Sequence, residues 1–294
     1  MSRRCITVMV VTLVGAIFVL TATAMAVNLK PYVLAYETEK GLDEVVGEVR
    51  SKLSSSGFDL VGEYRVDEKR HLVVITNDEI KNMAAKSKFG GFGAVVRVGI
   101  TSVGKKVQVS YTNPPYWANA YQLKDDLSGV FKRLKSSIGF EKEFGSEDGI
   151  EAEDLREYHY MFAMPYFEDF LNIGRAESYE AAIKRVEEGF KSGKSGVKKI
   201  YRVDIPGKEE TVYGVGITKG DGSDLHILEK IDTAELKHTA YLPYELLVSG
   251  NRIYALHGKF RIAISWPDLG LGTFMTISSA PGGIEDALKE LVNR

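Results

Sequence analysis

Apolar residues recur at helical spacing in two segments of this chain, and the residues that follow each segment also agree. The first apolar stripe consists of Leu42, Val45, Val46, Val49 and Leu53, and the second of Tyr179, Ala182, Ile183, Val186 and Phe190. With no gap, the same alignment places Tyr64-Arg65-Val66-Asp67 on Tyr201-Arg202-Val203-Asp204. Such stripes are typical of helices with one buried face. We therefore predict two copies of one domain in tandem.

Alternating apolar and polar positions, together with turn residues, predict the other elements of both copies. The first copy is expected to contain a strand at Tyr32–Tyr36, a helix at Leu42–Ser54, strands at Phe58–Tyr64 and His71–Thr76, a short helix after Asn77, a hairpin of Ala94–Ile100 with Val107–Tyr111, and a helix at Trp117–Ile138. The second copy repeats this order with Tyr158–Phe167, Tyr179–Phe190, Val197–Asp204, Thr211–Thr218, Asp232–Lys237, Leu242–Val248 and Arg252–Leu256, and adds Phe260–Trp266, Phe274–Ser278 and a last helix at Ile284–Val292.

The order of elements, β-α-β-β-α-β-β-α in each copy, defines the expected fold class and domain boundaries. Each lobe should be an antiparallel-rich sheet with helices on one face, which places the chain in the α+β class. The first lobe is expected at 27–140 and the second at 158–294, joined by a charged linker at 141–157. An N-terminal signal helix at 1–26 precedes them.

The N-terminus has the composition of a secretory signal. Ser2-Arg3-Arg4 is basic, the run from Ile6 to Leu20 is apolar, and small residues precede a cleavage site after Ala26. The alternative is an uncleaved anchor, because residues 5–27 carry no charge and about 20 apolar residues suffice to span a bilayer. Both interpretations place the rest of the chain outside the cytoplasm, periplasmic or secreted, since the arginines stay inside. Either Sec or twin-arginine export fits this start.

Cysteine content and charge exclude several classes of function. The chain has one cysteine, Cys5, inside the signal, so the exported part cannot be a disulfide scaffold, a thiol oxidoreductase, an iron–sulfur protein or a Cys₄ zinc protein. Without residues 1–26, Lys and Arg number 36 against 40 acidic residues, a net charge of −4. This mild acidity provides no electrostatic attraction for nucleic acid.

Three local motifs of the lobes point to a known domain family. They are the helix Leu42–Ser54 followed by Gly57-Phe58, the hairpin that opens at Leu242-Pro243-Tyr244 and returns at Gly250-Asn251-Arg252-Ile253, and the strand Val107–Tyr111 that ends in Asn113-Pro114. In these motifs both lobes resemble the domain-of-unknown-function family numbered 302. The resemblance implies a fold and no agreed activity. Members often open the hairpin with a Pro-Cys pair, whereas this chain has Phe92-Gly93 and Leu242-Pro243-Tyr244 there.

The aromatic and methionine-rich segment Tyr158–Met164 contains the candidate metal ligands. On a strand, His159 and Met161 would point to the same face, and an imidazole with a thioether suits copper. The third ligand would be His238 or His257. The alternative is a core strand in which methionine fills gaps between aromatic rings.

Two further aromatic segments are candidate ligand-binding surfaces. Tyr116 and Trp117 follow Asn113-Pro114-Pro115 at the start of a helix, and Trp266 precedes Pro267-Asp268. Exposed, these rings would form a stacking platform for a ligand or a partner; buried, they would lock a helix onto the sheet. The sequence leaves both interpretations open.

No catalytic constellation is recognisable in the sequence. The five histidines, His71, His159, His226, His238 and His257, do not repeat between the lobes, and there is neither a G-x-S-x-G elbow nor a phosphate-binding glycine loop ahead of a helix. We therefore predict an exported binding or interaction protein that takes an unknown small ligand or protein partner at the seam between its lobes. The alternatives are periplasmic copper handling through the second lobe and an enzyme of unknown reaction. No cofactor is required, and membrane contact is expected only through residues 5–27 if they are retained.

Overall fold

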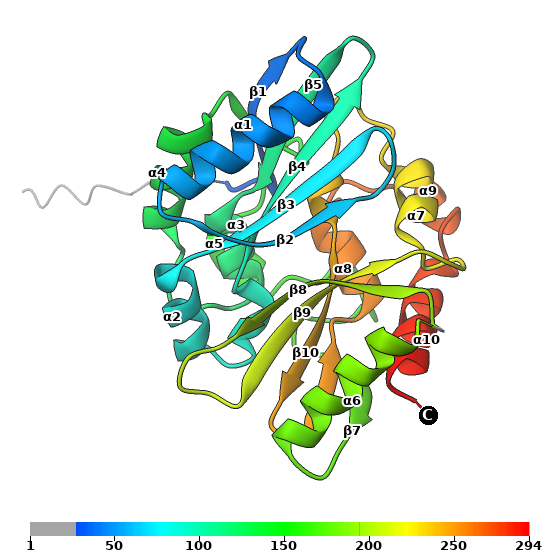
Figure 1. Cartoon of the computed structure of the whole chain (residues 1–294). Coiled ribbons are helices and arrows are strands. Elements are labelled where there is room, and N and C mark those ends of the chain that lie inside the picture. The colour runs from blue at the N-terminus through cyan, green and yellow to red at the C-terminus, as the bar shows by residue number, and fades with distance from the viewer. Residues whose placement is uncertain (1–27, 194, 294) are drawn as a thin grey trace, which may run out of the picture.

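The structure, a computed structural model, describes residues 28–193 and 195–293 and contains two antiparallel sheets packed together (Figure 1). The described residues form eleven strands, ten α-helices and two short 3-10 helices, which confirms the α+β class. The expected signal, residues 1–26, lies outside them. Within the described ranges, no helix combines the length and apolar character needed to cross a bilayer.

The first sheet has six strands in the order β2-β3-β4-β5-β1-β6. The bounds are β1 Tyr32–Thr38, β2 Asp59–Arg65, β3 Arg70–Thr76, β4 Val96–Val103, β5 Lys106–Thr112 and β6 Lys142–Phe144. Its outer face is covered by α1 (Leu42–Ser55) and α4 (Ser128–Ile138), whose apolar stripes pack on the sheet. The strand β6 comes from the expected linker, so that segment extends the first sheet and continues into α5 (Ala152–Arg156).

The second sheet has five strands in the order β7-β11-β10-β9-β8. The bounds are β7 Leu171–Arg175, β8 Val197–Asp204, β9 Glu210–Ile217, β10 Tyr244–Ser249 and β11 Arg252–Ala255. Its outer face is covered by α6 (Tyr179–Ser192) and α10 (Ala280–Val292). Read from β8, the strand order β8-β9-β10-β11-β7 corresponds position by position to β2-β3-β4-β5-β1 in the first sheet.

A third apolar core lies between the sheets and is built mostly from aromatic side chains. Two helices supply much of it: α3 (Pro114–Ala120), which starts with two prolines, and α8 (Gly258–Ser265), whose N-cap His257 accepts a hydrogen bond from the Lys259 N–H. The remaining elements border this core and are α2 (Asp78–Lys86), α7 (Asp224–Ile231), α9 (Leu271–Met275) and the 3-10 helices η1 (Gly90–Gly93) and η2 (Thr239–Tyr241).

Several predicted elements differ from those observed. The prediction of a strand at Tyr158–Phe167 is wrong, because this segment is an irregular loop and the edge strand is β7. The helix expected at Asp232–Lys237 is wrong as well, since α7 ends at Ile231 and a loop follows. The expected helix Trp117–Ile138 is divided into α3 and α4, and the added segments after β11 are largely the helices α8 and α9. Continuous apolar runs do not distinguish a buried helix from a strand by periodicity, which explains these differences.

Candidate ligand site at the seam between the sheets

The centre of the seam is a buried ion cluster. Arg97 is the second residue of β4 and Glu245 the second residue of β10, and the two form an ion pair with side chains 3% and 1% exposed. Arg261 of α8 also binds this carboxylate, with 3.2 Å between its Nε and Glu245 Oε2, and donates to the Tyr241 carbonyl oxygen at 2.5 Å. Each charge in the cluster therefore has an opposite charge or a hydrogen-bond acceptor beside it.

The predicted residues Tyr116 and Trp117 are buried next to this cluster. The guanidinium carbons of Arg97 and Arg261 lie 4.7 Å and 4.9 Å from the Trp117 ring centroid, so two cations lie over the indole. The Tyr116 hydroxyl donates to the Ile264 carbonyl oxygen at 2.8 Å. Both side chains are at most 5% exposed, so they lock α3 into the seam and form no exposed platform.

Contacts across the seam come in matching pairs. Trp117 and Arg261, which touch each other, are the fourth residues of α3 and α8. A Cβ added to Gly99 of β4 would lie 2.9 Å from the backbone nitrogen of Ala240 in η2, and one added to Gly91 in η1 would lie 2.5 Å from Leu247 of β10. Thus β4 packs on η2 as β10 packs on η1.

A buried Asp–His pair lies at one end of the seam. The Asp232 Oδ1 atom accepts hydrogen bonds from the backbone N–H of His238 at 2.9 Å and from its Nδ1 at 3.0 Å. With Asp232 accepting from Nδ1, the neutral form of the ring carries its lone pair on Nε2. Both side chains are at least nine-tenths buried, and neither His238 Nε2 nor Asp232 Oδ2 has a hydrogen-bond partner.

Aromatic rings surround the His238 imidazole. Its centroid lies 5.0 Å from that of Tyr32, 5.6 Å from Phe144 and 5.2 Å from Trp266. Trp266, the third predicted binding residue, is 5% exposed, and its Nε1 donor has no hydrogen-bond partner. His238, Trp266 and Phe144 line a pocket of about 450 Å³ together with Gly145, Ile231, Thr233, Ala234, Glu235, Leu236, Asp268, Leu269, Gly270 and Thr273.

The segment 145–149, called the strap below, passes over the imidazole. Gly145 has a φ of +99°, and a Cβ at this position would lie 3.2 Å from His238 Nε2, so glycine allows the backbone to lie against the ring. One carboxylate holds the strap: Asp268 accepts from Ser146 Oγ at 3.1 Å and from the Glu147 N–H at 2.6 Å. The pocket is therefore bounded by one segment joined to the first sheet and by loops of the second.

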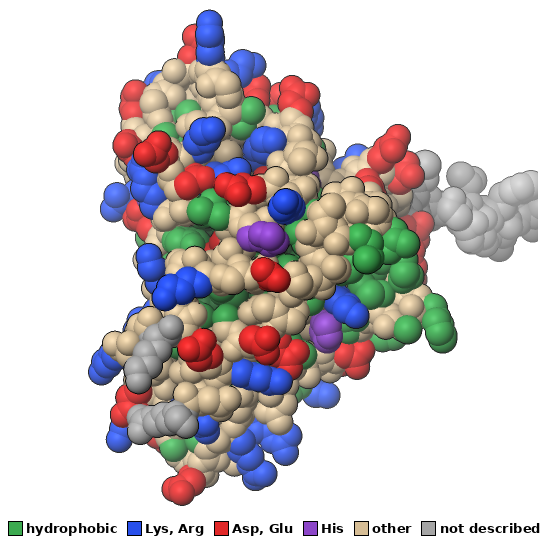
Figure 2. Space-filling model, turned by 90° about the vertical axis from the view of Figure 1, so that its right-hand side faces the viewer, with side chains coloured by type: hydrophobic (Ala, Val, Ile, Leu, Met, Phe, Trp, Pro, Cys, Tyr) green, Lys and Arg blue, Asp and Glu red, His purple; other side chains and the backbone are tan. Residues whose placement is uncertain are grey.

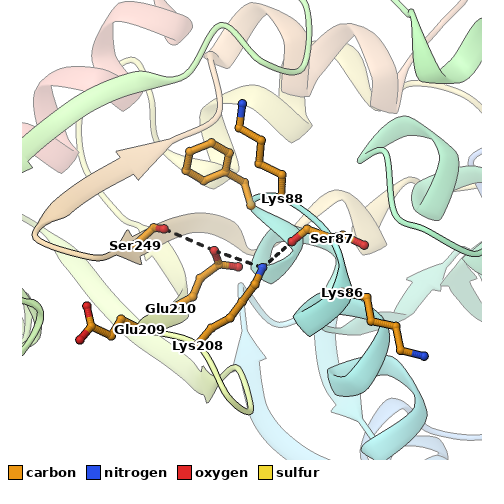
Figure 3. A pocket seen from close by; sticks show the side chains of 8 residues that line it. Lys86, Ser87, Lys88, Lys208, Glu209, Glu210 and Ser249 are labelled. Atoms are coloured by element: carbon orange, nitrogen blue, oxygen red, sulfur yellow. Dashed lines mark hydrogen bonds and ion pairs between the residues drawn. The ribbon is translucent and has the colours of Figure 1, made fainter.

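A second pocket, of about 410 Å³, lies at a different part of the seam (Figure 3). There the Gly91 N–H donates to Glu210 at 2.8 Å, and Lys208 donates to the Ser87 carbonyl oxygen while lying 3.9 Å from Glu210 Oε2. Burial raises the pKa of Glu210. Figure 3 shows Lys208 pointing to these acceptors. The polar groups of this second pocket bind one another across the seam. We call this corner the latch between the sheets.

The predicted metal ligands do not lie together on a strand. His159 and Met161 belong to the loop after α5 and line different pockets, and the His159 ring packs against Tyr166 with centroids 4.5 Å apart. His257 shares a pocket with His159. Among residues 28–193 and 195–293, no group of three or more His, Cys, Asp or Glu side chains is arranged to hold a metal ion. The copper hypothesis therefore gains no support from the geometry.

Comparisons with known proteins add no relative from which a function could be transferred. No family model matches the sequence, and no curated protein and no solved structure matches it. The geometry of the seam is accordingly what indicates a function.

Proposed function

We propose that this protein is an exported two-lobe binding protein whose small ligand occupies the pocket beside His238 and Trp266. One observation carries the proposal: two buried polar atoms, His238 Nε2 and Trp266 Nε1, lie without partners on side chains that line the same pocket of about 450 Å³. A buried polar group left unpaired costs about 1–3 kcal/mol. A ligand that pairs with these atoms would recover that cost, which supports a binding role at this place.

The lining of the pocket favours a small organic cation with a flat apolar frame. Its side chains include the carboxylates Glu235 and Asp268, and no lysine or arginine is among them. The lone pair on His238 Nε2 would accept a hydrogen bond from an N–H group of the ligand. The indole of Trp266 lines the pocket, and a cation over an indole ring gains about 0.5–2 kcal/mol. A pocket of this size suits a molecule with one or two rings.

The two lobes are proposed to be duplicated copies related by a pseudo-two-fold axis. Support comes from the common strand order and from the paired contacts, because a two-fold axis makes residue i touch j and j touch i. Arg97 with Glu245 and Trp117 with Arg261 are the pairs expected on such an axis. Export and a periplasmic or secreted location rest on the N-terminal composition, and the resemblance to family 302 stays a prediction.

Native mass spectrometry of the protein exported under its own signal tests this proposal. We expect a retained organic molecule in the wild type and in the control variant Glu210→Gln, which alters the latch, and its loss in His238→Gln. A retained mass that persists unchanged in His238→Gln would contradict the placement of the site. The same spectrum reports whether the chain starts at Val27.

A second candidate function, an enzyme, is favoured by the Asp232–His238 pair. An aspartate that fixes the tautomer of a buried histidine is an arrangement found in general-base catalysis. The two functions differ in a simple observation. A binding protein returns its ligand with an unchanged mass, whereas an enzyme converts it, and His238→Gln would abolish that conversion.

A further inference from the structure

Exposed apolar side chains are concentrated on one part of the surface. Among the described residues, six large hydrophobic side chains are exposed, and five of them come from two short segments. These five, called the apolar patch below, are Met161 at 44% exposure, Phe162 at 95%, Tyr166 at 43%, Leu271 at 59% and Met275 at 60%. The sixth is Phe140, at 42%. Figure 2 shows hydrophobic side chains gathered at one side of the face that it presents.

The two segments of the apolar patch lie next to each other. Tyr160, Met161 and Met164 of the loop after α5 and Leu269, Leu271 and Phe274 of the α9 region, together with Ala263, line a small groove in which the lining surface is apolar. A surface made of Met, Phe, Tyr and Leu from two adjacent loops is unusual for a part of a protein that faces only water, and it marks an interaction site.

A tight turn presents Phe162 at the tip of the loop. The Met164 N–H donates to the Met161 carbonyl oxygen at 3.0 Å, and Ala163 between them has a φ of +63°. A residue with a Cβ adopts this left-handed conformation at an energetic cost, and such costs are concentrated at functional segments. The turn therefore holds a phenyl ring away from the protein core.

Hydrogen bonds link the segment that precedes α9 to the place where the chain enters the fold. The first described residue, Asn28, donates to the Asp148 carbonyl oxygen at 3.0 Å, and Lys30 Nζ donates to that of Glu147 at 2.7 Å. The Glu147 N–H in turn donates to Asp268 at 2.6 Å, three residues before Leu271 of α9. The sequence immediately ahead of Asn28, residues 5–27, carries no charge.

We propose that the apolar patch docks on the surface of a lipid bilayer, with the Phe162 turn and α9 entering the interfacial layer. Two observations select a bilayer as the occupant. The Phe162 ring protrudes singly from a turn, as an inserting side chain would. The segment before α9 and the first described residue both bind residues 147–148, and the uncharged sequence ahead of Asn28 would itself associate with lipid. With the signal retained, patch and anchor reach the same membrane; after cleavage, the patch gives reversible attachment. This inference is independent of the ligand pocket.

Quenching by brominated lipid tests the proposal with a matched control. The exported protein is mixed with phosphatidylcholine vesicles that carry bromine on their acyl chains, and the variants Phe162→Trp and Phe140→Trp are compared. Trp117 and Trp266 are buried and supply the same background in both. We expect the fluorescence of the residue-162 variant to fall about twofold, since bromine quenches only rings that reach the acyl chains, and that of the residue-140 variant to stay unchanged.

The proposal is overturned if brominated lipid quenches neither variant, or quenches both to the same extent. A concentration-dependent dimer in analytical ultracentrifugation that Phe162→Ser abolishes, in the absence of quenching, would assign the patch to a second copy instead. As a second measurement, Phe162→Ser with Leu271→Ser should lower co-sedimentation with vesicles about tenfold. The thermal unfolding of this variant should match that of the wild type, because both side chains are exposed.

Discussion

Two polar clusters of the seam use the same kinds of residues in opposite ways. In the central cluster, Glu245 binds Arg97 and Arg261, and both guanidinium groups lie over the Trp117 ring. At the end of the seam, Asp232 binds His238 by one oxygen, while the second oxygen and the outer ring nitrogen have no partner. The first cluster has the properties of a structural joint. The second has those of a site, because the histidine with the unpaired ring nitrogen lines a pocket.

The difference teaches that burial alone does not identify a functional tryptophan. Trp117 and Trp266 are equally buried, at 5% exposure each. What separates them is their surroundings: two guanidinium groups lie over the ring of Trp117, whereas Trp266 lines a pocket beside an unpaired imidazole. Substitutions in the central cluster should therefore change stability, and substitutions in the Asp232–His238 cluster should change binding.

The largest effect is expected from removing the charge at the centre of the joint. Glu245→Gln leaves two buried guanidinium groups without their carboxylate, and we expect the free energy of unfolding to fall by about 3–5 kcal/mol in urea denaturation. The control is Glu44→Gln, which removes an exposed ion pair with Lys40 and should change stability by less than about 1 kcal/mol. Equal effects of the two variants would show that the central cluster is no joint.

The next effect concerns a paired acid that bridges the lobes. Asp224 accepts from the Tyr64 hydroxyl at 2.8 Å and from the Ile217 N–H at 3.0 Å, and burial raises its pKa from 3.8 to about 7. The folded protein thus holds this proton more tightly than the unfolded chain does. The contribution of Asp224 to stability is complete below about pH 4, is lost as the pH rises to about 7, and then stays constant.

The variant Asp224→Asn should remove this pH dependence. We expect it to match the wild type at pH 4 and to exceed its unfolding free energy at pH 8, by up to about 4 kcal/mol. Denaturant titrations at both pH values check the sign. A variant that is less stable than the wild type at pH 8 would mean that Asp224 is ionised and held by its two donors in the folded protein.

A smaller loss of stability is expected at Gly99, where the backbone of β4 lies close to the backbone of η2. Gly99→Ala places a methyl group 2.9 Å from the Ala240 nitrogen, and such overpacking costs about 1–3 kcal/mol. Gly47→Ala in α1 has no atom within 4 Å of the added Cβ, so it should stabilise the helix by about 0.5–1 kcal/mol. Thermal unfolding of the two variants should therefore shift in opposite directions. A shift in the same direction would argue against a tightly packed seam.

The smallest change in stability is expected in the second cluster. His238→Gln removes one hydrogen bond to Asp232, which still accepts from the backbone N–H, so the cost should be about 1 kcal/mol. Urea denaturation measures it. A loss as large as that of Glu245→Gln would place His238 among the structural joints and remove the distinction between the two clusters.

The sequence predicts the helices that cover the sheets better than it predicts the site. The apolar stripe of Leu42–Ser54 coincides with α1, and its counterpart at Tyr179–Phe190 coincides with α6, because one-sided burial leaves a periodic pattern. By contrast, the Asp232–His238 pair depends on a loop. If the helix expected at Asp232–Lys237 continued to His238, residues 232 and 238 would point to different sides, whereas the observed loop folds the ring back onto the carboxylate.

The central joint was equally beyond sequence reasoning. Arg97 and Glu245 lie 148 residues apart, and only the packing of one sheet on the other brings them together. The aromatic segment Tyr158–Phe167 misled the strand prediction because its rings alternate as in a strand. In the structure, Phe167 and the following Phe170 reach the central core from a loop, while Phe162 stays exposed.

The two tryptophans can report separately on ligand binding at the two clusters. With 5-fluorotryptophan incorporated, the chain gives two fluorine resonances, one from Trp117 in the joint and one from Trp266 in the proposed site. Benzamidine is a flat cation, and benzoate is its anionic counterpart. We expect benzamidine to shift the Trp266 resonance saturably, benzoate to leave it unchanged, and the Trp117 resonance to stay in place with both compounds. Equal responses to both compounds, or none at Trp266, would contradict the proposed site.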